Sequence, residues 1–122
     1  MTPKQFLTYG GAILVLVAIL GFVGVIGPMA DKSIFGSAWF FDNAENWAHL
    51  VIGVVGLIAA FATGPSVQKQ LAMAVGVVAL FFGVYNFFST SFLGAGLESP
   101  ADLILHLVVG IWAIWASMGK EA

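Results

Sequence analysis

The chain has no cysteine and no arginine among its 122 residues, and only 8% of those residues are charged. The lack of cysteine excludes disulfides, thiolate nucleophiles, iron–sulfur clusters and thiolate-bound zinc. Soluble domains carry roughly 25% charged residues, so this composition is not typical of a soluble domain. All four basic residues are lysines, and without arginine the chain lacks the footprint of a nucleic-acid-binding protein.

What the chain has in abundance is apolar sequence, with 61% hydrophobic residues and a mean hydropathy of +1.04. Four uncharged stretches each approach the ~20 residues that cross a ~30 Å hydrocarbon core. The first is too long for the apolar region of a signal peptide, and no small-x-small cleavage site follows it closely. We therefore predict an all-α membrane protein, a single domain over residues 1–122 with four transmembrane helices at about 5–27, 44–63, 67–89 and 101–118.

Turn and capping residues divide the chain at the same places. Asp42-Asn43-Ala44-Glu45 predicts a capping box before the second helix, and Ser99-Pro100-Ala101-Asp102 predicts another before the fourth. Gly-Pro pairs at 27–28 and 64–65 predict the ends of the first and second helices. These signals support two consecutive helical hairpins.

The longest connection, residues 28–43, is too apolar and aromatic for a free loop. Trp and other aromatic residues favour the headgroup level of a membrane. We predict that this segment is interfacial, lying along the membrane surface or folding over the end of the bundle. An ordinary aromatic belt is the alternative interpretation.

Three of the four lysines fall at the N-terminus, in the second connection and at the C-terminus. In a four-helix topology these three places share one side of the membrane. Lysine-rich segments favour the cytoplasmic side, so both termini are predicted to be cytoplasmic. The acidic residues then gather on the opposite side.

One nine-residue pattern occurs twice, at residues 45–53 and again at 102–110, as acid-x-x-x-His-Leu-Val-(Ile/Val)-Gly. The only two histidines, His49 and His106, belong to it. The pattern recurs in the second helix of each hairpin, which predicts two tandem hairpins related by a pseudo-twofold axis along the membrane normal. We expect the second and fourth helices to be neighbours, with both histidines facing inward at one depth.

Residues four apart share a helix face, so each acid, histidine and glycine of the pattern forms one stripe. The stripes consist of Glu45, His49 and Gly53 in the second helix, and of Asp102, His106 and Gly110 in the fourth. In the simplest interpretation the acids cap their helices, and the histidines hydrogen-bond to them, to Tyr85, to Asn86 or to each other. Ionisable groups within a membrane are nevertheless candidate functional sites.

Two functional interpretations of the stripes stay open. His49 and His106 could ligate a tetrapyrrole, either haem b or a chlorophyll-type pigment, with Gly53 and Gly110 leaving space for the flat ring. The same glycines also fit plain close packing. Alternatively, both histidines with Glu45 and Asp102 could form a divalent-metal or proton site.

Two segments carry a family resemblance, namely Asn46-x-x-His49-Leu50 and Asp102-x-x-x-His106-Leu107. They are similar to paired segments in the domain-of-unknown-function 4383 family of small four-helix bacterial membrane proteins. The resemblance implies a bacterial tetraspan protein. The expected location is a bacterial inner or photosynthetic membrane. It implies no activity and assigns no functional residue.

The chain shows no Ser-His-Asp set, phosphate-binding loop or pair of catalytic carboxylates, so we do not expect an enzyme. Almost no polar part extends outside the predicted bilayer to act alone. The leading expectation is therefore an accessory or structural subunit of a larger membrane complex. Its expected partners are lipid and other membrane subunits or further copies of itself, with tetrapyrrole binding and a metal or proton site as alternatives.

Overall fold

The computed structural model describes residues 1–92, 95–98 and 100–119, and four helices dominate it. These are α1 (Pro3–Phe22), α2 (Asn43–Ala62), α3 (Pro65–Tyr85) and α4 (Ala101–Ser117). Two 3-10 turns, η1 (Ala30–Lys32) and η2 (Gly36–Ala38), separate α1 from α2. A small antiparallel pair, β1 (Ser91–Phe92) with β2 (Ala95–Gly96), lies between α3 and α4. Apart from this pair and an isolated bridge between Ile26 and Ser33, the regular secondary structure of the described residues is helical, as predicted.

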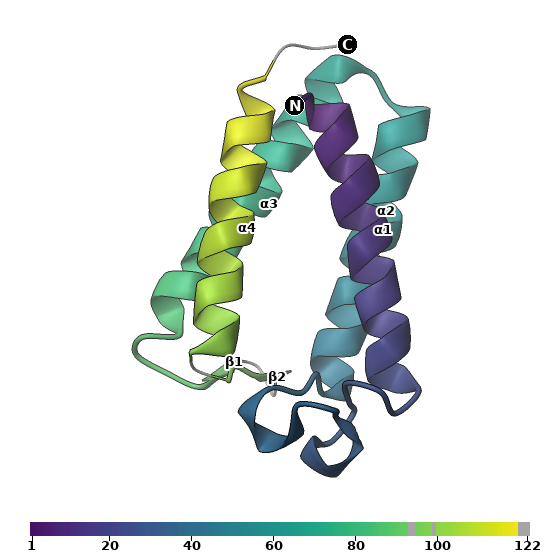
Figure 1. Ribbon diagram of the computed structural model, residues 1–122. Coiled ribbons are helices and arrows are strands. Elements are labelled where there is room, and N and C mark those ends of the chain that lie inside the picture. Colours follow the sequence, from purple (N-terminus) through teal and green to yellow (C-terminus); the bar gives the residue numbers. More distant parts are fainter. Residues whose placement is uncertain (93–94, 99, 120–122) are drawn as a thin grey trace.

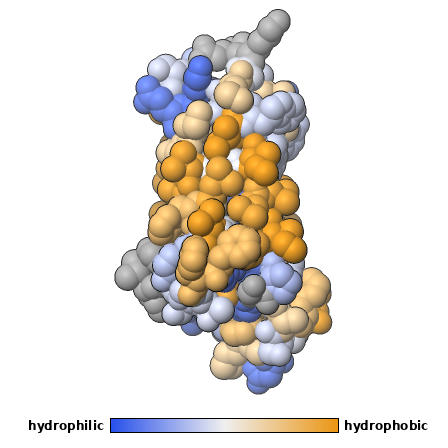
Figure 2. All heavy atoms as spheres, turned by 90° about the vertical axis from the view of Figure 1, so that its left-hand side faces the viewer, coloured by the Kyte–Doolittle hydropathy of each residue, from blue (hydrophilic) through white to orange (hydrophobic). Residues whose placement is uncertain are grey.

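The helices are apolar along most of their length. By length and composition α1, α2 and α3 could each cross a membrane, whereas α4 is shorter at 17 residues. At 1.5 Å per residue, α4 is about 26 Å long, slightly less than a ~30 Å hydrocarbon core. Figure 2 shows a broad apolar belt between two more polar ends.

The helices pack as two hairpins, α1 with α2 and α3 with α4. The hairpins lie closest at the end that holds the N-terminus, here called the termini end (Figure 1). They are farther apart at the opposite end, where η1, η2, β1 and β2 lie, here called the loop end. Our expectation that the second and fourth helices would be neighbours is wrong, because α2 and α4 do not form a packed pair.

Glycines of the repeated pattern pack within each hairpin. A Cβ added to Gly53 would lie 2.8 Å from the carbonyl oxygen of Gly11 on α1. A Cβ on Gly110 would lie 3.0 Å from the backbone nitrogen of Leu80, and one on Gly76 would lie 3.1 Å from the carbonyl oxygen of Gly110. Small residues let helix backbones approach closely. The glycine stripes therefore bring α2 against α1 and α4 against α3.

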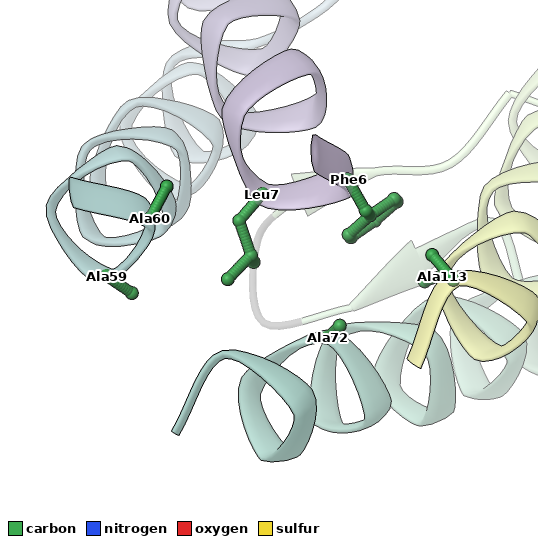
Figure 3. Close-up of a cluster of buried hydrophobic side chains, with 7 residues drawn as sticks. Phe6, Leu7, Ala59, Ala60, Ala72 and Ala113 are labelled. Atoms are coloured by element: carbon green, nitrogen blue, oxygen red, sulfur yellow. The ribbon is translucent and has the colours of Figure 1, made fainter. Parts of the chain in front are cut away.

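An apolar cluster joins the two hairpins at the termini end. Its buried members are Phe6, Leu7, Ala59, Ala60, Ala72, Ala113 and Ala116, most of them labelled in Figure 3. The Phe6 and Trp112 rings meet edge to face, with centroids 4.7 Å apart. Alanines dominate the rest of the cluster, which lets all four helices approach one another.

Helix α1 ends at Phe22, before the predicted end at residue 27. Gly24 adopts a positive φ of 88°, and the Val25 amide donates to the Leu20 carbonyl at 3.1 Å. This is a Schellman-type helix end, in which glycine accepts the left-handed conformation without a Cβ penalty. Helix α3 likewise ends early, at Tyr85, where the Phe87 and Phe88 amides donate to carbonyls three residues back.

The predicted capping box at α2 is confirmed, with Asp42 and Glu45 each bonding to the other's backbone N–H. At α4 the N-cap residue is Pro100, and no side chain caps the helix. The predicted partner Ser99 lies outside the described residues. The two Asp102 oxygens accept from the Trp39 indole and from the Glu98 amide.

Candidate functional site

Buried polar side-chain atoms without a hydrogen-bond partner gather at the loop end. Buried side-chain atoms that lack a hydrogen bond within the described part of the chain belong to Asn46, His49, Asn86, Glu98 and His106. Native proteins satisfy the great majority of buried polar atoms, so each exception calls for an explanation. Because all of these exceptions lie at one end of the bundle, that end is the candidate site.

A cluster of carboxyl groups forms the centre of the site. Glu45, Glu98 and Asp102 each offer one oxygen, and these oxygens all lie within 4.8 Å of one another. Glu45 comes from the first hairpin, whereas Glu98 and Asp102 come from the second. Glu45 is 6% exposed and Asp102 is fully buried. The cluster therefore spans the two hairpins, and the sequence predicted two of its members but not Glu98.

Asp102 holds the two hairpins together through its neighbours. The indole Nε1 of Trp39 donates to Asp102 Oδ1 at 2.9 Å, and the Glu98 amide donates to Asp102 Oδ2 at 2.8 Å. A longer bond of 3.4 Å runs from the Phe40 amide to Glu98 Oε1. Trp39 lies 63 residues from Asp102 in the chain, so no local pattern could have indicated this contact.

Asp42 makes a second link between the hairpins. One of its oxygens accepts from the Glu45 amide at 2.9 Å, which caps α2. The other oxygen accepts from the Gly96 amide at 2.6 Å, in the connection before α4. Every hydrogen bond described between the hairpins at the loop end therefore has a carboxylate as its acceptor.

Among the described residues, the hydrogen bonds to these carboxyl groups all come from backbone or indole N–H groups, which carry no charge. Lys4 and Lys69 belong to the termini end, and Lys32 is exposed on η1. Two like charges 4.8 Å apart repel by about 3.5 kcal/mol at an effective dielectric constant of ~20. Burial and the adjacent Asp102 together raise the pKa of Glu98 to about 8, so Glu98 keeps a proton at neutral pH. The cluster therefore favours a bound proton or cation over full ionisation.

The two histidines border this cluster and are partly buried. The His49 ring meets Phe41 edge to face at 5.5 Å, and the His106 ring lies 5.7 Å from Phe82. Asn86 was predicted as a partner of the histidines, but its Nδ2 donates instead to the backbone carbonyls of Ser89 and Leu97. The Nδ1 atoms of both histidines have no hydrogen-bond partner among the described residues.

Of the four residues predicted as metal ligands, the structure brings Glu45 and Asp102 together and adds Glu98. Within the described ranges, neither His49 nor His106 offers a ligand atom to this group. The resulting donor set is all oxygen, which suits hard cations such as Mg²⁺ or Ca²⁺ better than zinc.

Neighbouring helices fill the space beside the two glycines that were predicted to make room for a tetrapyrrole. The space beside Gly53 is filled by α1, and that beside Gly110 by α3. An apolar cleft of about 80 Å³ does lie between the hairpins, reaching Ile52 and Val109. Pockets for drug-sized ligands measure ~300–1,000 Å³. This cleft is therefore too small for a tetrapyrrole.

No family model, curated protein or solved structure matches this chain. The similarity to the domain-of-unknown-function 4383 family, which depends on the two histidine segments, stays a prediction. The geometry of the site is therefore the basis for the proposed function.

Proposed function

We propose that this protein is a small, non-enzymatic integral membrane protein that crosses the bilayer four times and serves as an accessory or structural subunit of a larger membrane assembly. The observation that carries the proposal is the apolar exterior. Large apolar side chains are exposed on all four helices, including Ile13, Val55, Phe81 and Ile111. Charged side chains are confined to the helix ends and connections. A chain built this way acts through contacts within the bilayer.

The proposed topology places both termini in the cytoplasm of a bacterial cell. Because the chain has no cysteine, single cysteines can be introduced and labelled without background. Ser37→Cys tests the loop end, and Ser66→Cys tests the connection between α2 and α3; both positions are exposed. With a membrane-impermeant thiol reagent on intact cells, we expect Ser37→Cys to be labelled and Ser66→Cys to be labelled only after the cells are opened. The reverse pattern would contradict the orientation.

A pseudo-twofold relation between the hairpins is part of the same proposal. Its support is that both hairpins use a glycine of the repeated pattern at their helix crossing, Gly53 against α1 and Gly110 against α3. Equivalent glycines would perform the same packing in a duplicated unit. The two repeated acids, Glu45 and Asp102, also meet in one cluster.

The accessory role is tested by the size of the native particle. The protein would be extracted from its native membranes in several mild detergents and sized with the detergent contribution subtracted. We expect a particle substantially larger than the 12.8 kDa chain. A lone monomer in every detergent would contradict a subunit role.

A second candidate function is a cation or proton site at the carboxyl cluster. The favouring observation is the approach of Glu45, Glu98 and Asp102 within 4.8 Å, from two hairpins. Carboxylate oxygens are the preferred ligands of Mg²⁺ and Ca²⁺. The candidate occupants are therefore a hard divalent ion or a shared proton.

Calorimetric titration with Mg²⁺, Ca²⁺ and Zn²⁺ separates these occupants. A metal site predicts binding that is lost in Glu98→Gln and kept in Asp31→Asn, a control that changes an exposed acid on η1. A proton site predicts no metal binding and a protonated carboxyl group at neutral pH. Full ionisation of the cluster without metal binding would exclude both.

A further inference from the structure

The connection between α1 and α2 folds across the loop end but buries little of itself. Neither η1 nor η2 contains a buried residue. Ile34 is 73% exposed and Phe35 is 49% exposed, whereas Ile26 and Phe41 near the two ends of the connection are buried. Segments with few buried apolar contacts open locally at low free-energy cost. The middle of this connection, residues 29–40, buries little apolar surface and is held at its ends and by the Ile34 amide, which donates to the Val25 carbonyl at 2.9 Å.

Trp39 supplies the main hold between this middle part and the second hairpin. Its indole donates to Asp102 Oδ1 at 2.9 Å, and its carbonyl accepts from the Ser33 hydroxyl at 2.8 Å. The other bond to the second hairpin, from the Phe40 amide to Glu98, is long at 3.4 Å. One side-chain hydrogen bond to a buried carboxylate thus contributes most of the attachment.

The groups next to this attachment are the polar ones of the candidate site. A row of aromatic contacts runs inward from Trp39 to Phe41, with ring centroids 5.3 Å apart, and from Phe41 to His49 at 5.5 Å. Asp102 itself belongs to the carboxyl cluster. His49 Nδ1 and Glu98 Oε2 are buried without partners among the described residues. Displacing Trp39 would therefore open a route from water to these groups.

We propose that residues 29–40 form a lid, latched on Asp102 by the Trp39 indole, and that release of this latch exposes His49 and the carboxyl cluster to the aqueous phase. The lid is a local conformational device of the loop end. It depends neither on a partner subunit nor on a bound cation, and so goes beyond the proposed function.

Carbethoxylation of histidine by diethyl pyrocarbonate tests the lid directly. His49 and His106 are the only histidines, so peptide mass spectrometry assigns a rate to each. Trp39→Phe removes the indole N–H while keeping an aromatic ring. The matched control is Trp112→Phe, which removes an indole N–H bonded to the Met1 sulfur at the termini end.

In the folded Trp39→Phe protein in lipid nanodiscs, the reagent should modify His49 on the order of tenfold faster than in the unchanged protein, the scale set by losing one hydrogen bond. Trp112→Phe should leave the His49 rate unchanged. Should Trp39→Phe fail to fold, Ser33→Ala should raise the rate by a smaller factor, because it removes the hydroxyl that donates to the Trp39 carbonyl and accepts from the Phe35 amide. An unchanged His49 rate in the folded variant would overturn the proposal. So would an equal rise at His106 with loss of helical circular dichroism, which would show the bundle opening as a whole.

Discussion

Replacing Gly53 by alanine tests whether the repeated glycines pack each hairpin. The added Cβ would lie 2.8 Å from the Gly11 carbonyl oxygen and 3.0 Å from the Val15 backbone nitrogen, so two helix backbones must separate. Overpacking of this kind costs about 1–3 kcal/mol. Alanine is better than glycine in a helix by about 1 kcal/mol, which offsets part of that cost. We expect a net loss of up to about 2 kcal/mol in the free energy of unfolding.

Gly56 provides a matched control on the same helix. Its added Cβ would meet the Leu7 carbonyl oxygen at 3.6 Å, an ordinary contact, so Gly56→Ala should be neutral or stabilising by up to about 1 kcal/mol. Both variants would be unfolded by titration from mild detergent into sodium dodecyl sulfate, followed by far-ultraviolet circular dichroism. Equal stability of Gly53→Ala and Gly56→Ala would refute the packing described for α1 and α2.

Three further predictions concern the two ends of the bundle. Asp42→Ala should lower the free energy of unfolding by more than the ~1 kcal/mol typical of losing an N-cap, because it also removes the hydrogen bond from the Gly96 amide. Thr2→Ala, which removes only the N-cap of α1, should lower it by less. The same detergent titration measures both variants. The pKa of Glu98 is about 8 in the folded state, above its ordinary value of 4.5. The contribution of Glu98 to the free energy of unfolding should therefore be complete below about pH 4.5 and be lost as the pH rises to about 8. The melting temperature of the unchanged protein should fall over that range, and that of Glu98→Gln should fall less. Protein purified from its native host should show no Soret absorption band, since α1 and α3 fill the space beside the repeated glycines; a band lost in His49→Ala would contradict this.

The helices and several of their ends could be predicted because their signals are local. Apolar runs separated by charges indicate where helices lie, and the Asp42 and Glu45 capping box appears in the structure as expected. The end of the first helix lies before Gly24, whereas the Gly-Pro pair at residues 27–28 predicts a later end. A lone glycine near a helix end does not by itself reveal its φ.

The partners of each helix face could not be predicted in the same way. Periodicity places Glu45, His49 and Gly53 on one stripe, but it does not say which helix that stripe meets. The structure places α1 beside Gly53, while Glu45 meets the second hairpin. Glu98 and Trp39 enter the site through connections, where no periodic pattern constrains the direction of a side chain. Their contacts with Asp102 depend on the tertiary arrangement of both hairpins.

One claim is central to the candidate site, namely that carboxyl groups from both hairpins share a buried cluster. The proposed cation or proton site and the Trp39 hydrogen bond to Asp102 both depend on it. Infrared spectroscopy of the carboxyl C=O stretch tests this claim most directly, because it separates protonated from ionised groups. We predict a protonated carboxyl band at pH 6 that declines as the pH passes through about 8 and is smaller in Glu98→Gln. Complete ionisation of every carboxyl group at pH 6, or an identical band in Glu98→Gln, would contradict the cluster.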